Sequence, residues 1–433
     1  MLQGQRPNAS LAAQASPVPV TLKDIMRLVR PGVRARRSKR LLIYLHVPFC
    51  SSKCHFCDWV VGYPTPDLVN TGGLRQQYVD ALCAQIRSYG PRLAELGYQV
   101  TNIYWGGGTP TRLAPEQLAR IQSELDAVFD LSPVVEHTAE CSPETVTSQH
   151  LETWLRAGLT RISVGVQSFD DDVLRRMGRA HNASGAVEAL ALFRKTGLRN
   201  FNIDLITGFP DQRTEVVIES IRQTIDLGVP HVSLYMFREF SPELVAVGQV
   251  RQGHRVQTPR QQRAETYMKA KAVLEAAGYE EYVVGYFALK PEFRFDGEQY
   301  YFSLAGDYFG FGAGASSTIG RFSLRSGDSS RYGGAQVRAF IAQPTRMLAA
   351  PLESLPDALY LSAYFKVFAT REGVRFTRWS DQFGFDFRIF RAERPAIQAW
   401  FTEQESGGAC FIETERSISL SSETWTETMM WRQ

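Results

Sequence analysis

Three observations predict an α/β protein with a parallel sheet. Short β-rich runs alternate with amphipathic stretches six times between residues 41 and 240. The chain has 433 residues, 44% of them hydrophobic and 12% aromatic, which is enough to bury one large core and a smaller second unit. After about residue 331 the pattern changes to short helices. Because repeated strand–helix units place successive strands in parallel, we expect a parallel sheet with helical crossovers.

The expected strands cover residues 41–47, 100–105, 134–141, 160–167, 199–207 and 230–236. In the helix expected after Pro115, Leu118, Ile121 and Leu125 fall on one face at helical spacing. A further helix is expected over 186–196, ended by Gly197. A full eight-unit barrel would need two more strand–helix repeats, and none is visible after residue 240.

The later chain divides into three expected parts. A long helix is expected over 258–277, and a Tyr- and Phe-rich region with the run GDYFGFGAGASS at 306–317 follows it. Short helices at 357–370, 377–383 and 395–403 and a hairpin at 410–420 complete the chain. We expect the domains to be a basic N-terminal extension (1–40), a core (41–260), an aromatic and Gly-rich extension (261–330) and a C-terminal domain (331–433).

Three cysteines directly follow the first expected strand. Cys50, Cys54 and Cys57 have the spacing C-x3-C-x2-C. Three thiolates leave a 4Fe–4S cluster one ligand short, so the open iron could bind a small molecule. Buried cysteines or a structural zinc site are the alternatives, but zinc would need a fourth ligand and paired cysteine spacing.

This spacing resembles that of the radical S-adenosylmethionine (SAM) superfamily. The motifs YLHVPFC, CHFCDW, WGGGTPT at 105–111, GVQSFDDDVLRRMGRAH at 165–181 and IDLITGFP at 203–210 are similar to one branch of it. That branch contains oxygen-independent coproporphyrinogen III oxidase, its heme-chaperone relatives and the class C radical SAM methyltransferases. The resemblance implies a partial (β/α)6 radical SAM barrel, open on one side, with a smaller, mainly helical C-terminal domain.

The resemblance also implies the cofactors. Cys50, Cys54 and Cys57 would hold a 4Fe–4S cluster, and SAM would bind the fourth iron and be cleaved to a 5'-deoxyadenosyl radical. Phe56 matches an aromatic residue beside the adenine of SAM, although plain packing is the alternative.

A run of three glycines, Gly106, Gly107 and Gly108, follows the second expected strand, and Thr109 comes next. Backbone without side chains can approach a ligand closely. In the resembled family the equivalent glycines meet the methionine amino group of SAM; an ordinary turn is the alternative. Glu140 ends the third strand, where a carboxylate faces the barrel mouth and could accept from the SAM ammonium.

Three more residues match SAM-contacting positions of the family, namely Gln167, Arg179 and Asp204. Gln and Asp can hydrogen-bond ribose hydroxyls, and Arg can bind a carboxylate through two hydrogen bonds.

Tyr44 and His46 alternate on the first strand, so they share a face, which we expect to look into the barrel. Tyr44 and His46 could act directly in the reaction or could have a structural role. Tyr235, at the end of the sixth strand, is a candidate residue of the substrate cavity.

Two departures from the branch guide the choice of reaction. Coproporphyrinogen oxidase has a further cysteine two positions after the third ligand, whereas this chain has Asp58 and Trp59 after Cys57. The heme chaperones carry a His–Asn pair where this chain has Glu298 and Gln299. We therefore expect a class C methyltransferase with two SAM molecules, which adds a SAM-derived methylene radical to an sp2 carbon and yields C-methylation or a cyclopropane. The alternatives are a heme chaperone-like or coproporphyrinogen oxidase-like protein and an anaerobic heme methyltransferase.

Composition and chemistry set the expected partners. The substrate should be a planar or unsaturated small molecule. The aromatic region 279–311 is a candidate wall for it, with a place in the core as the alternative. Flavodoxin or ferredoxin should supply electrons. A methyltransferase-like enzyme is a further candidate partner.

A net charge of +3 is too small to imply nucleic acid as a partner, and no apolar run reaches the roughly 18 residues that cross a membrane. An oxygen-sensitive cluster favours the cytoplasm. In the N-terminal segment 1–40, basic residues concentrate between Lys23 and Arg40. We expect a short helix at 21–28 followed by a basic linker, with a transit peptide as the alternative.

Overall fold

The fold is built around one large sheet with helices along its outer face. The computed structural model describes residues 18–20, 39–57, 72–237, 260–303, 305–319, 322–327, 333–351, 367–383 and 386–421. The helix expected at 21–28 and most of the one expected at 357–370 lie outside these residues.

Six parallel strands form the centre of the sheet, as predicted. They pair in chain order, so that each strand contacts the one before and the one after it. Parallel pairing in sequence brings all six C-terminal strand ends to one edge of the sheet, where barrels of this kind place their chemistry. The strands are β2 (Arg40–Val47), β3 (Gln99–Gly107), β4 (Glu136–Cys141), β5 (Arg161–Gln167), β6 (Phe201–Thr207) and β7 (His231–Met236).

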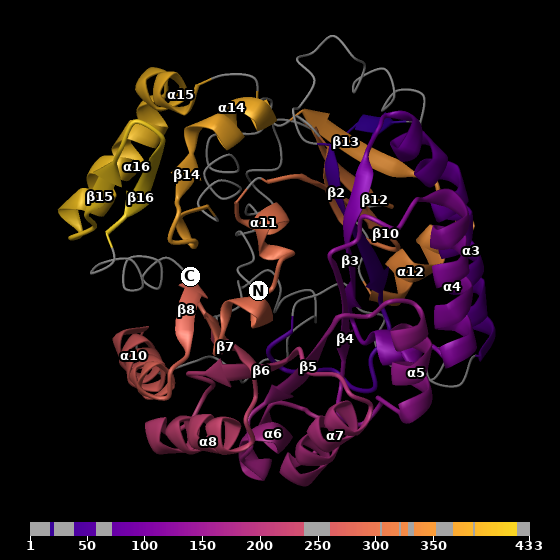
Figure 1. Ribbon diagram of the computed structural model, residues 1–433, viewed down its shortest axis with the longest axis horizontal. Coiled ribbons are helices and arrows are strands. Elements are labelled where there is room, and N and C mark those ends of the chain that lie inside the picture. The colour runs from indigo at the N-terminus through magenta and orange to yellow at the C-terminus, as the bar shows by residue number, and fades with distance from the viewer. Residues whose placement is uncertain are drawn as a thin grey trace.

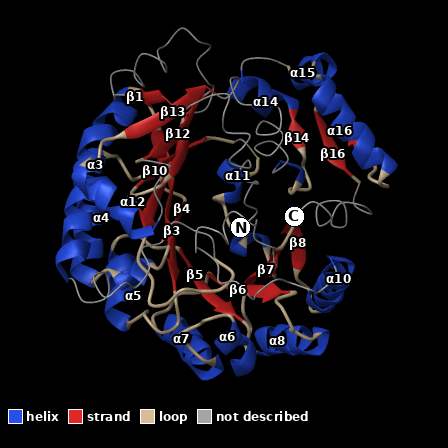
Figure 2. Ribbon diagram, turned by 180° about the vertical axis from the view of Figure 1, so that it is seen from behind, coloured by secondary structure: helices blue, strands red, loops and turns tan. Residues whose placement is uncertain are grey.

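Helices connect these strands and lie outside the curved sheet in both views (Figures 1 and 2). Side-chain caps begin several of them: Thr147, Asp170 and Asn182 accept hydrogen bonds from backbone N–H groups in the first turns that follow. The helices are α3 (Gly72–Glu95), α4 (Pro115–Val128), α5 (Ser148–Arg156), α6 (Asp171–Arg176), α7 (Ala183–Lys195), α8 (Thr214–Asp226) and α10 (Arg260–Ala276).

The sheet extends beyond the six strands at both edges, which the sequence analysis did not predict. On one side β10 (Asp307–Phe311) runs parallel to β2, and three antiparallel strands and β1 follow. On the other side β9 pairs antiparallel with β7, and β8 pairs antiparallel with β9 at the edge of the sheet. The sheet thus reaches Pro351, past residue 331, where the C-terminal domain was expected to begin. The added strands are β1 (Val18–Val20), β8 (Glu280–Val283), β9 (Tyr286–Ala288), β11 (Ser316–Ile319), β12 (Phe322–Ser326) and β13 (Met347–Pro351).

The C-terminal region forms a small unit across the sheet from α3 and α4 (Figure 1). It contacts the end of the large sheet through backbone: Val284 N–H donates to Ala369 O at 2.9 Å. Arg371 Nε also donates to Glu281 O at 2.9 Å. The unit comprises β14 (Val374–Arg375), β15 (Phe411–Glu413), β16 (Ser417–Leu420), α14 (Phe376–Phe383), α15 (Phe387–Glu393) and α16 (Pro395–Ser406).

Strand alternation separates the core from the barrel interior. In β2, Leu41, Ile43 and Leu45 are fully buried in the main hydrophobic cluster, whereas Tyr44 is only partly buried. One face of the sheet therefore packs under the helices, and the other face lines the interior. Within the described part of the chain, no helix is long and apolar enough to span a membrane.

A buried histidine joins two of the central strands. His137 on β4 accepts a hydrogen bond from Trp105 Nε1 on β3 at 2.9 Å, and its Nδ1 lies 3.1 Å from Ala157 O. These contacts suit a neutral imidazole that donates from Nδ1 and accepts at Nε2. Burial lowers the pKa of His137 to about 4.

We predict that His137 makes the fold sensitive to acid. Its pKa is lower in the folded chain than in the unfolded chain, so the unfolded state binds the proton first and stability falls as the pH drops below about 6.5. Between pH 7 and pH 5 the loss from this residue should be about 2 kcal/mol. Urea unfolding of the wild type and of His137→Gln at both pH values measures it: the variant should be less stable at pH 7 but lose less on acidification. Equal losses in the two proteins would contradict this account.

Candidate functional site

Each of the six parallel strands has a partly exposed residue at or beyond its midpoint. Strand pairing sets these residues on neighbouring strands at similar depths: Tyr44 lies beside Tyr104, and Gly165 beside Asp204. Most other residues of these strands are buried, so the partly exposed positions mark the wall of the barrel interior. The set is Tyr44, Tyr104, Glu140, Gly165, Asp204 and Tyr235.

The three cysteines lie together on the loop that follows β2. This loop rests on the end of α6: His55 N–H donates to Met177 O at 2.9 Å, and Ser52 Oγ donates to Gly178 O at 2.9 Å. Gly178 has φ +74°, and a Cβ there would lie 2.7 Å from Lys53 O. The loop's shape therefore depends on a glycine more than 120 residues further along the chain.

Two of the cysteine sulfurs accept hydrogen bonds. Thr109 Oγ1 lies 3.8 Å from Cys50 Sγ, and Arg179 Nη1 lies 3.3 Å from Cys54 Sγ. Burial, and then the neighbouring Cys54, raise the pKa of Cys50 to about 12. Among the described residues, no group of three His, Cys, Asp or Glu side chains is arranged to hold a metal ion.

The glycine run serves close backbone packing against β2 and the cysteine loop. Gly108 N–H donates to Val47 O at 2.8 Å, and a Cβ on Gly108 would lie 2.8 Å from that oxygen. Gly107 has φ +106°, and a Cβ there would lie 2.5 Å from the His46 ring. Thr109 N–H donates to Phe49 O at 2.7 Å. Two glycines are thus required by neighbouring protein atoms, whether or not a ligand also approaches them.

Glu140 lies beside this run and faces the interior. Tyr104 OH donates to its Oε1 at 2.6 Å, and Gly107 N–H donates to its Oε2 at 3.2 Å. Burial raises the pKa of Glu140 to about 7, although the hydrogen bond from Tyr104 opposes the rise. This carboxylate can therefore change its charge near neutral pH.

Asp204 and Gln167 stand on the next two strands. Asn202 Nδ2 donates to Asp204 Oδ1 at 2.8 Å, and burial raises the pKa of Asp204. Gln167 is the last residue of β5 and has φ +73°. This is a left-handed backbone conformation that residues other than glycine rarely adopt. The irregularity in pairing between Gly165 and Gln167 lies at the same place. Backbone strain of this kind is frequent at binding sites.

Arg179 holds the cysteine loop to the ends of β4 and β5. Besides Cys54, it donates from Nη2 to Gly165 O at 2.6 Å and to Ser142 Oγ at 3.0 Å. Tyr44 and His46 share a face, as expected, and Tyr44 OH lies 2.9 Å from His46 Nδ1. The structure thus brings Arg179 and the Tyr44–His46 pair to the cysteine side of the barrel.

Two other predicted residues lie mainly in packing contacts. Phe56 and Tyr235 both pack against a small hydrophobic cluster that includes Ile206 and Phe209. Tyr235 also faces the Tyr286 ring, with centroids 6.3 Å apart. For Phe56 the packing alternative is present in the structure, and the adenine contact stays a prediction.

Glu298 and Gln299 lie in the short helix α11 (Glu298–Tyr301). Ser303 Oγ donates to Glu298 Oε2 at 3.2 Å, and Gln299 Nε2 donates to Asp296 Oδ1 at 2.5 Å. Burial raises the pKa of Glu298 to about 7.

Sequence reasoning missed two residues of the site. Tyr104 binds Glu140, and Ser142 links Arg179 to Glu144 through its hydroxyl. Tyr104 could have been found, because it lies two residues before Gly106 and so shares the inward face of β3. Ser142 follows the end of β4, and no motif marks its contact with Arg179.

The fold and the cysteine loop define the class of protein. Residues 44–224 match the model of the radical SAM superfamily. The chain is 31% identical over 306 residues to the heme chaperone HemW of Haemophilus influenzae, which covers 67% of this chain and 73% of that protein. The chain therefore belongs to the radical SAM superfamily and is a homologue of the heme chaperones.

A second relative and a solved structure agree with this placement. HemW of Escherichia coli is 32% identical over 286 residues, covering 64% of this chain and 70% of that protein. The structure of coproporphyrinogen III oxidase (HemN) from Escherichia coli matches with a TM-score of 0.71 and 20% identity, over 98% of this chain and 97% of that one. This likeness shows a common fold: a mixed α/β radical SAM fold with a parallel sheet and a helical C-terminal region.

The predicted reaction was wrong. We expected transfer of a methyl or methylene group from a second SAM molecule, but the relatives matched over most of their length are heme chaperones. Glu298 and Gln299, which stand where the chaperones were expected to carry a His–Asn pair, do not exclude this relationship, because 67% of the chain matches a heme chaperone at 31% identity. The expected second SAM molecule and methyltransferase activity have no support in these comparisons.

Membership of the superfamily implies a 4Fe–4S cluster and SAM as cofactors. The residues present fit such a cluster: three thiols share one loop, and two of their sulfurs face hydrogen-bond donors from other elements. Beside the loop, Glu140 and Asp204 give the barrel interior polar groups that suit a charged ligand.

We predict that Cys54→Ala abolishes cluster binding, because it removes one of the three candidate ligands and the Arg179 contact. Iron analysis and visible absorption after anaerobic reconstitution provide the measurement. Cys83→Ala is the matched control, since Cys83 is buried in α3 away from the loop, and it should bind iron normally. Full iron content in Cys54→Ala would rule out the assignment of this loop.

Tyr104→Phe should raise the pKa of Glu140 above its value of about 7. The substitution removes a hydrogen bond that favours the ionised carboxylate. At pH 7 a smaller fraction of Glu140 would then be charged. Carboxyl carbon NMR of glutamate-labelled protein across pH 5 to 9 measures the titration, with Glu140→Gln to assign the signal. Tyr235→Phe, which leaves this hydrogen bond in place, should titrate as the wild type does.

Proposed function

We propose that this protein binds heme and carries it, as a heme chaperone built on the radical SAM fold. The observation that supports this is the 31% identity with the Haemophilus influenzae heme chaperone over 73% of its length. The same relationship recurs in the chaperones of Bacillus subtilis and Escherichia coli, at 31% and 32% identity. The planar substrate expected from the sequence agrees with a tetrapyrrole.

In this proposal the cysteine loop and the barrel wall hold the radical SAM cofactors. Cys50, Cys54 and Cys57 would bind the cluster, and Glu140 and Arg179 would bind the charged ends of SAM. The remaining candidates from the sequence analysis keep their proposed places around SAM: Phe56, Gly106, Gly107, Gly108, Thr109, Gln167 and Asp204. When bound, these cofactors supply one-electron cleavage of the SAM sulfonium. A reducing donor of the flavodoxin or ferredoxin type and a cytoplasmic location both suit an oxygen-sensitive cluster.

The heme iron would need a ligand other than the residues at 298 and 299. Protein ligands of heme iron are usually His, Cys, Met or Tyr, and this chain has Glu298 and Gln299 there. Tyr301, at the end of the same helix, is partly buried, and its hydroxyl makes no hydrogen bond within the described residues. Its ring lies 5.3 Å from that of Tyr308 on β10. We propose Tyr301 as the iron ligand.

Heme titration tests the function. Hemin added to the purified protein under anaerobic conditions should give a saturable change in the heme absorption spectrum at one heme per chain. Transfer of that heme to an apo-heme acceptor should follow. No saturable binding, together with oxidation of coproporphyrinogen in the presence of SAM, would contradict the proposal and favour an oxidase.

The ligand assignment has its own variants. Tyr301→Phe should weaken hemin binding about tenfold or more and change the spectrum, because it removes the iron ligand. Tyr300→Phe is the matched control: Tyr300 is buried, and its hydroxyl pairs with Thr101. If Tyr301→Phe binds hemin with an unchanged spectrum, the ligand lies elsewhere, while the function itself still depends on the titration.

A further inference from the structure

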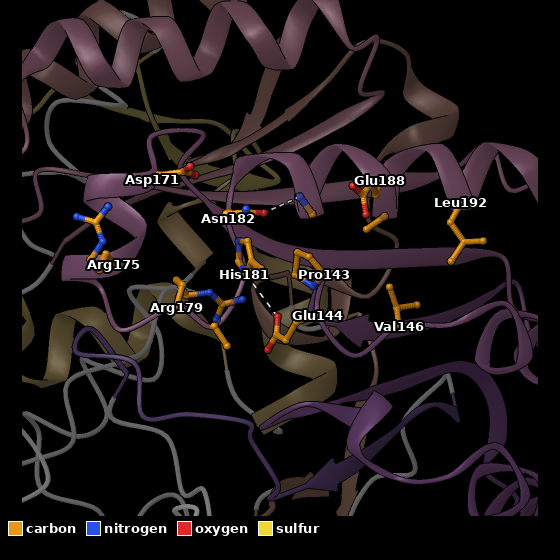
Figure 3. Close-up of a pocket in the computed structure, with 13 residues that line it drawn as sticks. Pro143, Glu144, Val146, Asp171, Arg175, Arg179, His181, Asn182, Glu188 and Leu192 are labelled. Carbon is orange, nitrogen blue, oxygen red and sulfur yellow. Dashed lines mark hydrogen bonds and ion pairs between the residues drawn. The ribbon is translucent and has the colours of Figure 1, made fainter.

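A cavity of about 660 Å³ lies beside α7, and Arg179, which contacts the cysteine loop, is one of its lining residues (Figure 3). Its walls come from the segment after β4, from α6 and the segment that joins it to α7, and from α7. Ligand cavities commonly have volumes of about 300–1,000 Å³. No residue of this cavity except Arg179 belongs to the site described above.

One face of α7 lines the cavity. Gly185, Glu188, Ala189 and Leu192 recur at helical spacing and all contribute to the wall. The two small residues leave space, and Leu192 adds an apolar surface. Val146 faces the cavity at the same end as Leu192 in the close-up (Figure 3).

Charged groups are ordered along the cavity. In Figure 3 Arg175 and Arg179 lie at one end, Val146 and Leu192 lie at the other, and Glu144 lies between them. Glu188 is exposed to the cavity and makes no ion pair or hydrogen bond within the described residues. By contrast, Asp171 and Asn182 already accept hydrogen bonds from backbone N–H groups at the start of α7.

Glu144 keeps a negative charge in this position. Although burial acts in the opposite direction, hydrogen bonds from His181 and Ser142 and the charge of Arg179 lower the pKa of Glu144 to about 2. His181 Nδ1 lies 3.4 Å from Glu144 Oε2. The cavity therefore presents a fixed carboxylate between a basic end and an apolar end.

The cavity also shares a wall with the cysteine loop. Arg179 lines it and donates to Cys54 Sγ at 3.3 Å. Arg179 also donates to Ser142 Oγ, and Ser142 donates to Glu144. A ligand in the cavity would therefore lie one side chain away from the cysteine loop.

We propose that this cavity binds a free α-amino acid with an unbranched apolar side chain. The Arg175 guanidinium, which donates from Nη1 to Asp172 and has further N–H groups, matches the carboxylate. Glu144 and Glu188 match the ammonium, and Val146 with Leu192 match the side chain. L-methionine is the natural probe, because it is the amino-acid part of SAM and has such a side chain. The proposal stands apart from heme binding, since it uses a different part of the molecule.

Calorimetry tests it on reconstituted protein saturated with SAM and kept unreduced, so that the open iron is occupied. L-methionine should still bind, at one molecule per chain, and N-acetylmethionine, which lacks the ammonium, should not. Glu188→Gln should weaken L-methionine binding about tenfold, because one charge-assisted contact is lost. Leu192→Trp should abolish binding by filling the apolar end.

Glu152→Gln is the matched control, because Glu152 is an exposed acid on α5 that does not line the cavity. It should bind L-methionine as the wild type does. Absence of methionine binding in the presence of SAM would overturn the proposal. So would binding that Glu188→Gln and Leu192→Trp leave unchanged. Neither result bears on hemin titration, so the two proposals fail separately.

Discussion

The parallel pairing of β2 with β3 is the contact on which the site depends. It places the cysteine loop after β2 directly against the glycine run after β3, where Gly108 N–H reaches Val47 O and Thr109 N–H reaches Phe49 O. Side chains at Gly107 or Gly108 would collide with His46 or with backbone oxygens. The same packing lets Thr109 approach Cys50 and lets Glu140 accept from Gly107 N–H. Thiols, carboxylate and backbone donors thus share one edge of the sheet.

Much of the central fold could be predicted, because its signals are local. The six strands carry apolar runs that the chain reveals within a few residues, and the cysteine spacing is contained in eight residues. The outer strands could not be predicted in the same way. β1 has three residues and pairs with β13, more than 300 residues later, so its stability comes from a distant partner and not from its own pattern.

The site shows the same division. The position of Glu140 follows from where β4 ends, whereas Asp204 lies in the middle of β6, and the structure places both in the barrel wall. Contacts through side chains, such as Tyr104 with Glu140 or Arg179 with Ser142, depend on the relative height of neighbouring strands and loops. The reaction was the weakest inference. Residues that bind a shared cofactor are alike across the superfamily, so they carry little information about the molecule that the protein finally acts on.

The contact between the cysteine loop and Gly178 has a consequence for biosynthesis. The loop is translated early, but Met177 and Gly178, which hold its backbone in place, emerge from the ribosome more than 100 residues later. Until then the three thiols lie on a segment without its supporting surface. A cluster in this loop would therefore have its complete protein surroundings only after β5 and α6 have been synthesised.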